Sequence, residues 1–253
     1  MRLAAAFLLA LSACNADSAS PHLARGNVLV NNGKREEAAA EYREAAKLAP
    51  RSALPRERLG DTLYDLGQKD AALAAYKEAS AVDPDSVTAR IGAARVLGDK
   101  GDLAGARAEL TAGLDKAPTN LFLLLSRGNY AAKAGDKDAA VADYTRAVNL
   151  KSDNVPALYA LGTALLDKRD LDAAQRTYDR LTQVAPNAPE GYYGRARVLE
   201  ARGDKAGAAQ AAQQAEARVE ADARARLTEQ GLKGEALEKA VHEAAERFKT
   251  AAR

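Results

Sequence analysis

Few residues of this chain have the types and spacing that catalysis or metal binding requires. The sequence contains two histidines, His22 and His242, near opposite ends, and a single cysteine, Cys14. A zinc site needs His, Cys or carboxylate ligands grouped at short spacings, and no such group is present in the sequence. It also lacks the HExxH, GxSxG, P-loop and glycine-rich dinucleotide motifs. We therefore expect no enzyme, and no metal or cofactor.

The residues before Cys14 indicate that this cysteine is acylated. Arg2 precedes an apolar run, Leu3 to Ala10, that is far too short to span a bilayer as a helix. The segment Leu11-Ser12-Ala13-Cys14 resembles the bacterial lipobox. The resemblance implies that residues 1–13 are a signal peptide and that Cys14 carries the lipid. The alternatives are an ordinary secretory signal and an apolar terminus that is never cleaved.

Residues 14–18 then serve as a short polar tether between the lipid and the first helix. In enteric lipoproteins an aspartate after the cysteine retains the protein at the inner membrane, and here that residue is Asn15. The resemblance therefore favours an outer-membrane lipoprotein that faces the periplasm. The absence of further cysteines excludes a disulfide framework.

The charge balance argues against nucleic acid as a partner. The chain has 37 basic and 35 acidic residues, a net charge of +2, and the two signs are interspersed along the sequence. Neutralising phosphates requires a basic stripe or patch, which the sequence lacks. Aromatic residues make up only 5% of the chain, and there is no tryptophan. We therefore expect closely packed helices with thin interfaces and a protein partner.

A period of 34 residues organises most of the chain. Pro50, Pro84, Pro118 and Pro186 are separated by 34, 34 and 68 residues. Alanine recurs in the same register at Ala38, Ala72, Ala106, Ala140, Ala174 and Ala208. Glycine occupies two further registers, one with Gly26, Gly60, Gly128 and Gly162 and the other with Gly33, Gly67, Gly101, Gly135 and Gly203. Tyrosine recurs at Tyr42, Tyr76, Tyr144 and Tyr178.

A 34-residue period with Gly at position 8, Ala at 20, Tyr at 24 and Pro at 32 resembles the tetratricopeptide repeat. The repeats predicted in this register are 19–52, 53–86, 87–120, 121–154, 155–188 and 189–222. The resemblance implies an all-α, right-handed α-solenoid of six helix hairpins. Helix A of each hairpin covers about the first fourteen positions, and helix B covers positions 17 to 31.

The repeated residues predict the local structure of each hairpin. We expect the small residues at positions 8 and 20 where helices A and B cross closely, and the position-24 tyrosines in the core. Glycine at position 15 suits a left-handed turn after helix A, and Arg169 at that position predicts a stiffer or different fifth turn. Polar residues at position 34 predict helix N-caps at Ser52, Ser86, Asn120 and Asn154, with Asn187 in that role before the sixth repeat.

Residues 223–253 continue beyond the repeats. Helix B of the sixth repeat should run from Lys205 to Gln230, because the segment contains no proline and hardly a glycine. A last amphipathic helix follows over 235–252, with Leu237, Val241, Ala244 and Phe248 on one face. Capping of the last repeat is one role for this helix, since a solenoid needs a polar outer end. The other is dimerisation or docking.

In tetratricopeptide arrays the A helices line a concave groove, where partners lie as extended peptides or helices. Positions 2, 5, 9 and 12 are expected to face the groove. The groove residues predicted in this way are Asp61, Tyr64, Ile91, Arg95, Phe122, Leu125, Asn129, Tyr159, Thr163, Tyr193 and Arg197. Apolar side chains among polar ones suit a peptide whose backbone also needs partners. The alternative is that the apolar ones pack between repeats.

The family's carboxylate clamp for free C-termini is absent from the sequence. That clamp pairs a lysine at position 5 with an asparagine at position 9. Asn27 and Asn129 occupy position 9, but their position-5 partners are Leu23 and Leu125. An internal segment of a partner protein is therefore expected.

Taken together, these features predict a lipid-anchored, periplasm-facing scaffold that binds an envelope protein. The chain resembles in architecture the pilotin lipoproteins that assist the type IV pilus secretin. An adaptor for peptidoglycan enzymes or for exopolysaccharide export is an alternative. Two other classes remain: a structural protein that self-assembles as a homodimer through its last helix, and a glycan-binding module that uses Tyr159 and Tyr193.

Overall fold

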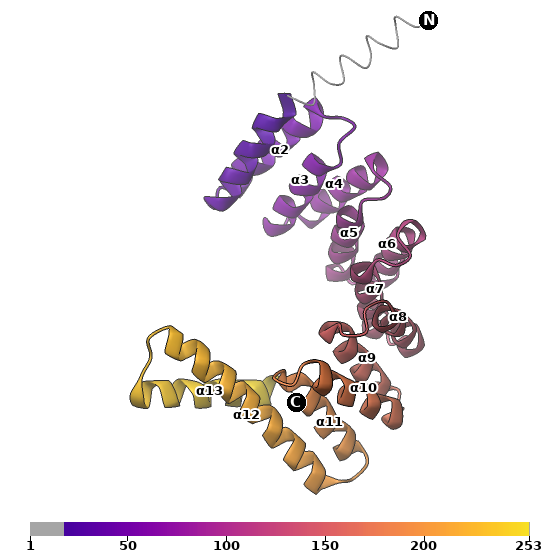
Figure 1. Ribbon diagram of the computed structural model, residues 1–253. Helices are drawn as coiled ribbons and strands as arrows, with labels where there is room; N and C mark the ends of the chain where they lie inside the picture. Colours follow the sequence, from indigo (N-terminus) through magenta and orange to yellow (C-terminus); the bar gives the residue numbers. More distant parts are fainter. Residues whose placement is uncertain (1–17, 253) are drawn as a thin grey trace, which may run out of the picture. The chain divides into compact units, whose positions relative to one another are not determined.

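The computed structural model describes residues 18–252, and in this range every regular element is an α-helix (Figure 1). The predicted signal peptide, Cys14 and nearly all of the tether lie outside the described residues. The chain divides into two compact units between Ala134 and Gly135, in the turn of the predicted fourth repeat. No helix within residues 18–252 is long and apolar enough to cross a membrane. The predicted all-α class of stacked helix hairpins is confirmed.

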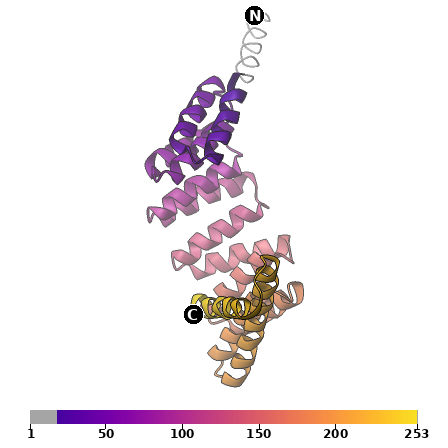
Figure 2. The ribbon, with the colours of Figure 1, turned by 90° about the vertical axis from the view of Figure 1, so that its left-hand side faces the viewer.

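The first unit is a series of helix hairpins, each packed on the next (Figures 1 and 2). It contains a helix over residues 18–31, then α2 (Arg35–Leu48), α3 (Leu54–Asp65), α4 (Lys69–Val82), α5 (Val87–Asp99), α6 (Leu103–Lys116) and α7 (Leu121–Lys133). Each labelled helix contacts the next in sequence, and α5 also contacts both α3 and α7. The A helices of this unit therefore lie side by side along one face.

The second unit continues the same pattern with its own helices. These are α8 (Lys137–Leu150), α9 (Val155–Asp167), α10 (Leu171–Val184), α11 (Pro189–Ala201), α12 (Lys205–Glu229) and α13 (Gly234–Ala252). Consecutive helices contact each other, and the A helices α9 and α11 are also in contact. Pro156 and Pro189 lie in the first turns of α9 and α11, where a missing N–H leaves no hydrogen bond unmade.

Short polar side chains start most of the helices by accepting a hydrogen bond from the backbone N–H three residues later. Three of the predicted position-34 caps, Ser86, Asn120 and Asn154, do this for α5, α7 and α9. The aspartates after the turn start the B helices in the same way; they are Asp102, Asp136, Asp170 and Asp204.

Two of the predicted caps are wrong. Helix α3 starts from Ala53 rather than Ser52 and has no side-chain cap bond. The Ser52 carbonyl instead accepts a hydrogen bond from Arg56 Nη1 at 2.9 Å. Helix α11 starts from Ala188, also without a side-chain cap bond, so Asn187 does not take the role predicted for it. Both helices have a proline in the first turn, which removes one of the N–H groups that a cap would satisfy.

The turn between helices A and B is left-handed throughout. Its glycines have φ values from 73° to 85°, at Gly33, Gly67, Gly101, Gly135 and Gly203. Arg169 adopts the same conformation, with φ of 65°, and is the one non-glycine residue with positive φ within residues 18–252. The prediction of a different fifth turn is therefore wrong in its backbone geometry. For a residue with a Cβ, this left-handed backbone conformation costs about 1–2 kcal/mol relative to the right-handed one.

The position-24 tyrosines are buried, as predicted, and each ring explains the small residues around it. Tyr76 and Tyr178 are fully buried. A Cβ on Gly60, in the same repeat as Tyr76, would come within 2.7 Å of that ring. A Cβ on Gly92, in the next repeat, would come within 2.3 Å. The tyrosine therefore fills the space between two A helices, and a side chain at either glycine would collide with it.

The same arrangement surrounds Tyr178 in the second unit. A Cβ on Gly162 would come within 2.7 Å of the Tyr178 ring, and one on Gly194 within 2.1 Å. The glycine at position 8 therefore lies where helices A and B of one repeat meet, as predicted, and it contacts the tyrosine ring of helix B. The contact of the same ring with the position-6 glycine of the following repeat was not predicted.

The last two helices form a long hairpin. Helix α12 ends near the predicted point, Gly231 and Gly234 have positive φ, and α13 packs back along α12 (Figure 1). Val241 and Ala245 of α13 are 3% and 2% exposed, so the apolar face of this helix is covered by the chain itself. This packing is the capping arrangement expected at the end of a repeat array.

Candidate functional site

The polar residues at position 9 of the A helices are held by the buried tyrosine of the same repeat. The hydroxyl of Tyr76 donates to Asp61 Oδ1 at 2.6 Å. Two further repeats have the same pairing, Tyr42 with Asn27 at 2.8 Å and Tyr178 with Thr163 at 3.1 Å. Because each tyrosine ring is fixed in the core, its hydroxyl orders a polar side chain on the predicted groove face.

In the first unit the structure brings together three predicted groove residues, Asp61, Tyr64 and Arg95. Arg95 Nη2 lies 3.0 Å from the Tyr76 hydroxyl and 3.4 Å from Asp61 Oδ1. The Arg95 guanidinium also lies over the Tyr64 ring, with Cζ 3.9 Å from the ring centroid. Tyr64 in turn donates to Asp99 Oδ2 at 2.5 Å. These contacts join α3 and α5 into one ordered polar surface.

This surface holds its tyrosines in the neutral form. The hydrogen bond to Asp99 raises the pKa of Tyr64 above its ordinary value, and burial raises it further. Burial is the larger cause for Tyr76, whose pKa is raised further still, with the Asp61 carboxylate adding to the effect. A neutral hydroxyl donates its hydrogen to a carboxylate, so the network is fully formed at neutral pH.

The apolar groove residues of the first unit differ in exposure. Phe122, at the start of α7, is 70% exposed. Ile91 and Leu125 are half-buried, which is consistent with packing between repeats, and Asn129 is exposed. Among the described residues it is the most exposed large apolar side chain, ahead of Val28 at 58%.

In the second unit, Tyr159 and Thr163 lie above the buried Tyr178. The Tyr159 ring is 36% exposed, and its centroid lies 6.4 Å from that of Tyr178 in a tilted arrangement. Burial raises the pKa of Tyr178 to about 12. Tyr193 is engaged differently, because its ring packs edge-on against Phe248 of α13, with centroids 5.7 Å apart. The C-terminal helix therefore covers part of the A-helix surface, which the sequence analysis did not predict.

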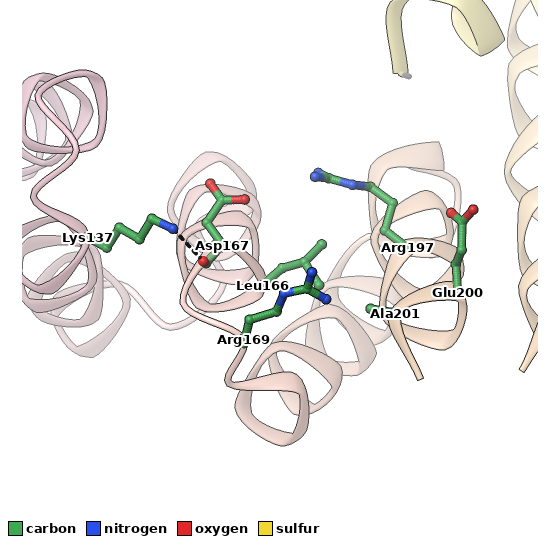
Figure 3. A pocket seen from close by; sticks show the side chains of 7 residues that line it. All are labelled: Lys137, Leu166, Asp167, Arg169, Arg197, Glu200 and Ala201. Carbon is green, nitrogen blue, oxygen red and sulfur yellow. Dashed lines mark hydrogen bonds between the residues drawn. The ribbon is translucent and has the colours of Figure 1, made fainter. Parts of the chain in front are cut away.

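A cavity of about 490 Å³ lies at the C-terminal ends of α9 and α11 in the second unit (Figure 3). Its walls carry both charge signs and a single larger apolar side chain. The lining residues are Lys137, Leu166, Asp167, Arg169, Arg197, Glu200 and Ala201. Lys137 Nζ donates to the Asp167 backbone carbonyl at 2.7 Å. Three residues at the predicted groove positions line this cavity: Arg197 at position 9, and Leu166 and Glu200 at position 12.

Arg169 was predicted only as a break in the glycine pattern, and its place in the lining of the cavity was not predicted. The replacement of glycine by arginine in this register was the available indication, because strained residues in left-handed turns gather at functional sites. The hydrogen bond between Tyr76 and Asp61 was also not predicted. Their fixed separation of 15 residues recurs as Asn27 with Tyr42 and Thr163 with Tyr178, and the repeat register alone reveals it.

The solved structures similar to this chain are themselves repeat proteins. PilW, described as a widely conserved type IV pilus biogenesis factor, aligns with a TM-score of 0.64 at 19% identity, over 79% of this chain and 93% of PilW. YrrB, described as a TPR protein with an unusual peptide-binding site, aligns with a TM-score of 0.59 at 21% identity, over 70% of this chain and 91% of YrrB. MamA aligns with a TM-score of 0.60 at 23% identity, over 66% of this chain and 97% of MamA. At these identities the likeness shows the fold alone.

Comparison of the sequence with curated proteins gave no match. The tetratricopeptide repeat family model, in contrast, matches four segments that together span most of the chain: 23–63, 57–120, 125–174 and 159–225. Such repeats are generally non-enzymatic scaffolds for protein–protein interaction, and their stacked helices present extended binding surfaces. With the helix hairpins, the left-handed turns and the buried tyrosines in the expected register, the chain belongs to the tetratricopeptide repeat family.

Proposed function

We propose that this chain is a non-enzymatic, lipid-anchored scaffold of the bacterial cell envelope that binds a partner protein along its A helices. The observation that carries the proposal is Phe122, which is 70% exposed on the first turn of an A helix. Burying such a ring against a partner contributes about 1.5–3 kcal/mol. The ordered polar groups around Asp61 and Arg95 supply hydrogen bonds for the partner backbone.

Within this function we propose a part in assembling an envelope complex of the pilus or secretin type. The support is architectural, since PilW is a pilus biogenesis factor of the same fold and nearly all of its length aligns with this chain. The peptide-binding site named for YrrB supports an extended segment as the bound form. MamA is as similar as either, so the choice of envelope system rests on the lipobox as well as on the fold.

The binding surface can be tested by replacing Phe122 and Tyr159 with serine and measuring recovery of envelope proteins on the purified chain. Phe122 is 70% exposed, so its replacement should change stability by less than about 0.5 kcal/mol. Tyr159 is 36% exposed and packs against Tyr178, so the thermal unfolding of the variant is measured beside its recovery of partner. The matched control replaces Leu150 and Val184, which are 47% and 37% exposed at the ends of B helices. We expect recovery of the partner to fall only in the first variant. Equal recovery by both variants would remove the surface from the proposal.

The lipid anchor is tested separately by mass measurement of the mature chain. We expect a chain that begins at Cys14 and carries acyl groups, and a Cys14→Ser variant that is not cleaved there. An acylated mature chain should sediment with membranes, whereas the serine variant should remain in the soluble fraction. A mature chain that retains Met1 would contradict this part of the proposal.

A further inference from the structure

The cavity between the ends of α9 and α11 contains two arginines whose charges have no partner. Arg169 reaches it from the turn after α9, and Arg197 extends from α11 toward α9 (Figure 3). Among the described residues, neither guanidinium makes a hydrogen bond or an ion pair. Asp167 and Glu200 also line the cavity, but no oxygen of either carboxylate pairs with these arginines.

Comparable cations on the same kind of turn are paired. Lys168, next to Arg169, forms an ion pair with Asp138 of the preceding repeat, and Arg202 does the same with Asp172. In the first unit, Lys100 pairs with Asp70 at the equivalent position. The basic residues Lys100, Lys168 and Arg202, all at position 14, therefore each form an ion pair with an aspartate of the preceding repeat. Within residues 18–252, Arg169 and Arg197 form no such pair.

The backbone at Arg169 gives an independent indication. All the other positions with positive φ within residues 18–252 are glycines. A strained residue persists where the surrounding structure or a function maintains it, and such residues gather at ligand-binding sites. A glycine would fit this turn better, so the guanidinium that the turn delivers to the cavity is a reason for keeping arginine there.

The charge of the cavity sets the chemistry of its ligand. Lys137, Arg169 and Arg197 outnumber Asp167 and Glu200, which gives the lining a net charge of +1. The planar guanidinium fork matches a carboxylate with two parallel hydrogen bonds. Arg169 is exposed and Arg197 is half-buried, so both guanidinium groups are accessible to a partner side chain. The cavity also lies at the ends of the A helices α9 and α11, beside Leu166, in the unit that carries Tyr159 and Thr163.

We infer that the cavity at Arg169 and Arg197 binds the side-chain carboxylate of an aspartate or glutamate in an internal, extended segment of the partner protein. This inference rests on the proposed function, because it specifies the chemistry of the segment held on the A helices. Arg169 then contributes to the choice of partner. A partner segment with a lysine or arginine at the position that meets the cavity should be disfavoured.

A library of random peptides, displayed with both ends fused so that no free carboxyl terminus is present, tests the inference on the full chain. The same library is selected on an Arg169→Gly, Arg197→Gln double variant. The control variant, Arg176→Gln with Arg180→Gln, loses the same charge from exposed positions on α10 that do not line the cavity. A selected peptide is then compared with its Glu→Gln or Asp→Asn form by titration.

We expect acidic residues at a fixed place in the peptides selected by the parent chain and by the control, and no such preference in the double variant. Removing the peptide carboxylate should weaken binding to the parent roughly tenfold or more, and should leave binding to the double variant unchanged. Selected peptides without an acidic preference, or with the same preference on the double variant, would overturn the inference while leaving the proposed function intact. If no peptide is selected by any of the chains, the proposed function fails, and the inference fails with it.

Discussion

The Tyr76 hydroxyl donates to the Asp61 carboxylate at 2.6 Å, and this bond connects the core of the first unit to the surface of its A helices. The Tyr76 ring is fixed between two glycines of neighbouring A helices, so Asp61 and Arg95 are ordered before any partner arrives. A surface prepared in this way loses less conformational entropy on binding than one that must order its side chains.

Removal of this hydroxyl should cost more stability than removal of its counterpart in the second unit. Tyr76→Phe removes the shorter of the two hydrogen bonds to the Asp61 carboxylate and leaves Arg95 Nη2 at 3.4 Å, and we expect a loss of about 1.5–3 kcal/mol. Tyr178→Phe loses a bond to the neutral Thr163 hydroxyl, for which about 0.5–1.5 kcal/mol is expected. Urea unfolding of both variants measures the difference. Equal losses would show that the Asp61 charge contributes nothing to the ordering of this face.

Gly194→Ala should destabilise the second unit, although glycine-to-alanine changes inside helices usually stabilise. The new methyl group would lie 2.1 Å from the Tyr178 ring, which is fully buried and has Gly162 on its other neighbouring A helix. Overpacking of this kind costs about 1–3 kcal/mol. Thermal unfolding of the variant provides the measurement, and Gly92→Ala should repeat the effect at Tyr76 in the first unit. A gain in stability would mean that the ring is free to move aside.

Arg169→Gly should stabilise the fifth turn by about 1 kcal/mol, because it removes a side chain from a left-handed backbone. Arg169→Lys keeps the same strain and should leave the unfolding free energy unchanged. Denaturant unfolding of the two variants measures the difference, with the lysine variant, which keeps both the strain and the charge, as the control. If the lysine variant is stabilised as much as the glycine variant, the strain account of this turn is incorrect.

Alkaline conditions should unfold the chain through its buried tyrosines. Burial raises the pKa of Tyr144 and Tyr178 to about 12, above the ordinary value of 10.0. The neutral form is therefore favoured by folding. Its contribution is complete below pH 10, the unfolded value, and is lost as the pH rises toward 12.

Ultraviolet absorbance of tyrosinate, followed together with circular dichroism, measures this dependence. We expect the exposed tyrosines to ionise first, and the buried ones to ionise together with the loss of helix. Tyr178→Phe should reduce the steepness of the stability loss between these pH values. Full ionisation of all tyrosines near pH 10 with the helices intact would contradict the assigned burial.

Much of the fold follows from the sequence because the repeat register fixes it at several positions at once. Left-handed turns at Gly33 and Gly203 and buried rings at Tyr42 and Tyr178 each follow from the physical demands of one residue type. A helix start is less certain, because several side chains can serve. Ser52 illustrates this, since the chain enters α3 one residue later and leaves the serine hydroxyl outside the cap.

The candidate site was predicted less completely, because its contacts join residues that are far apart in the sequence. The contact of Phe248 with Tyr193 depends on the path of α12 and α13, which lie beyond the repeating pattern. The Arg169 and Arg197 cavity depends on how two turns of neighbouring hairpins meet. Periodicity assigns a residue to a helix face, but it does not give the contacts that cover that face.

Site-specific photo-crosslinking at Phe122 tests the central claim most directly. A benzophenone side chain at this position, in cells that express the full chain, should form a crosslink with a protein partner when irradiated. The same side chain at Leu150, on the end of a B helix, should not form it. A discrete crosslinked species from position 122, lost when Arg95 and Asp61 are replaced by alanine, is the predicted result. The absence of any crosslink at 122, or an identical pattern at 122 and 150, would contradict a partner-binding surface on the A helices.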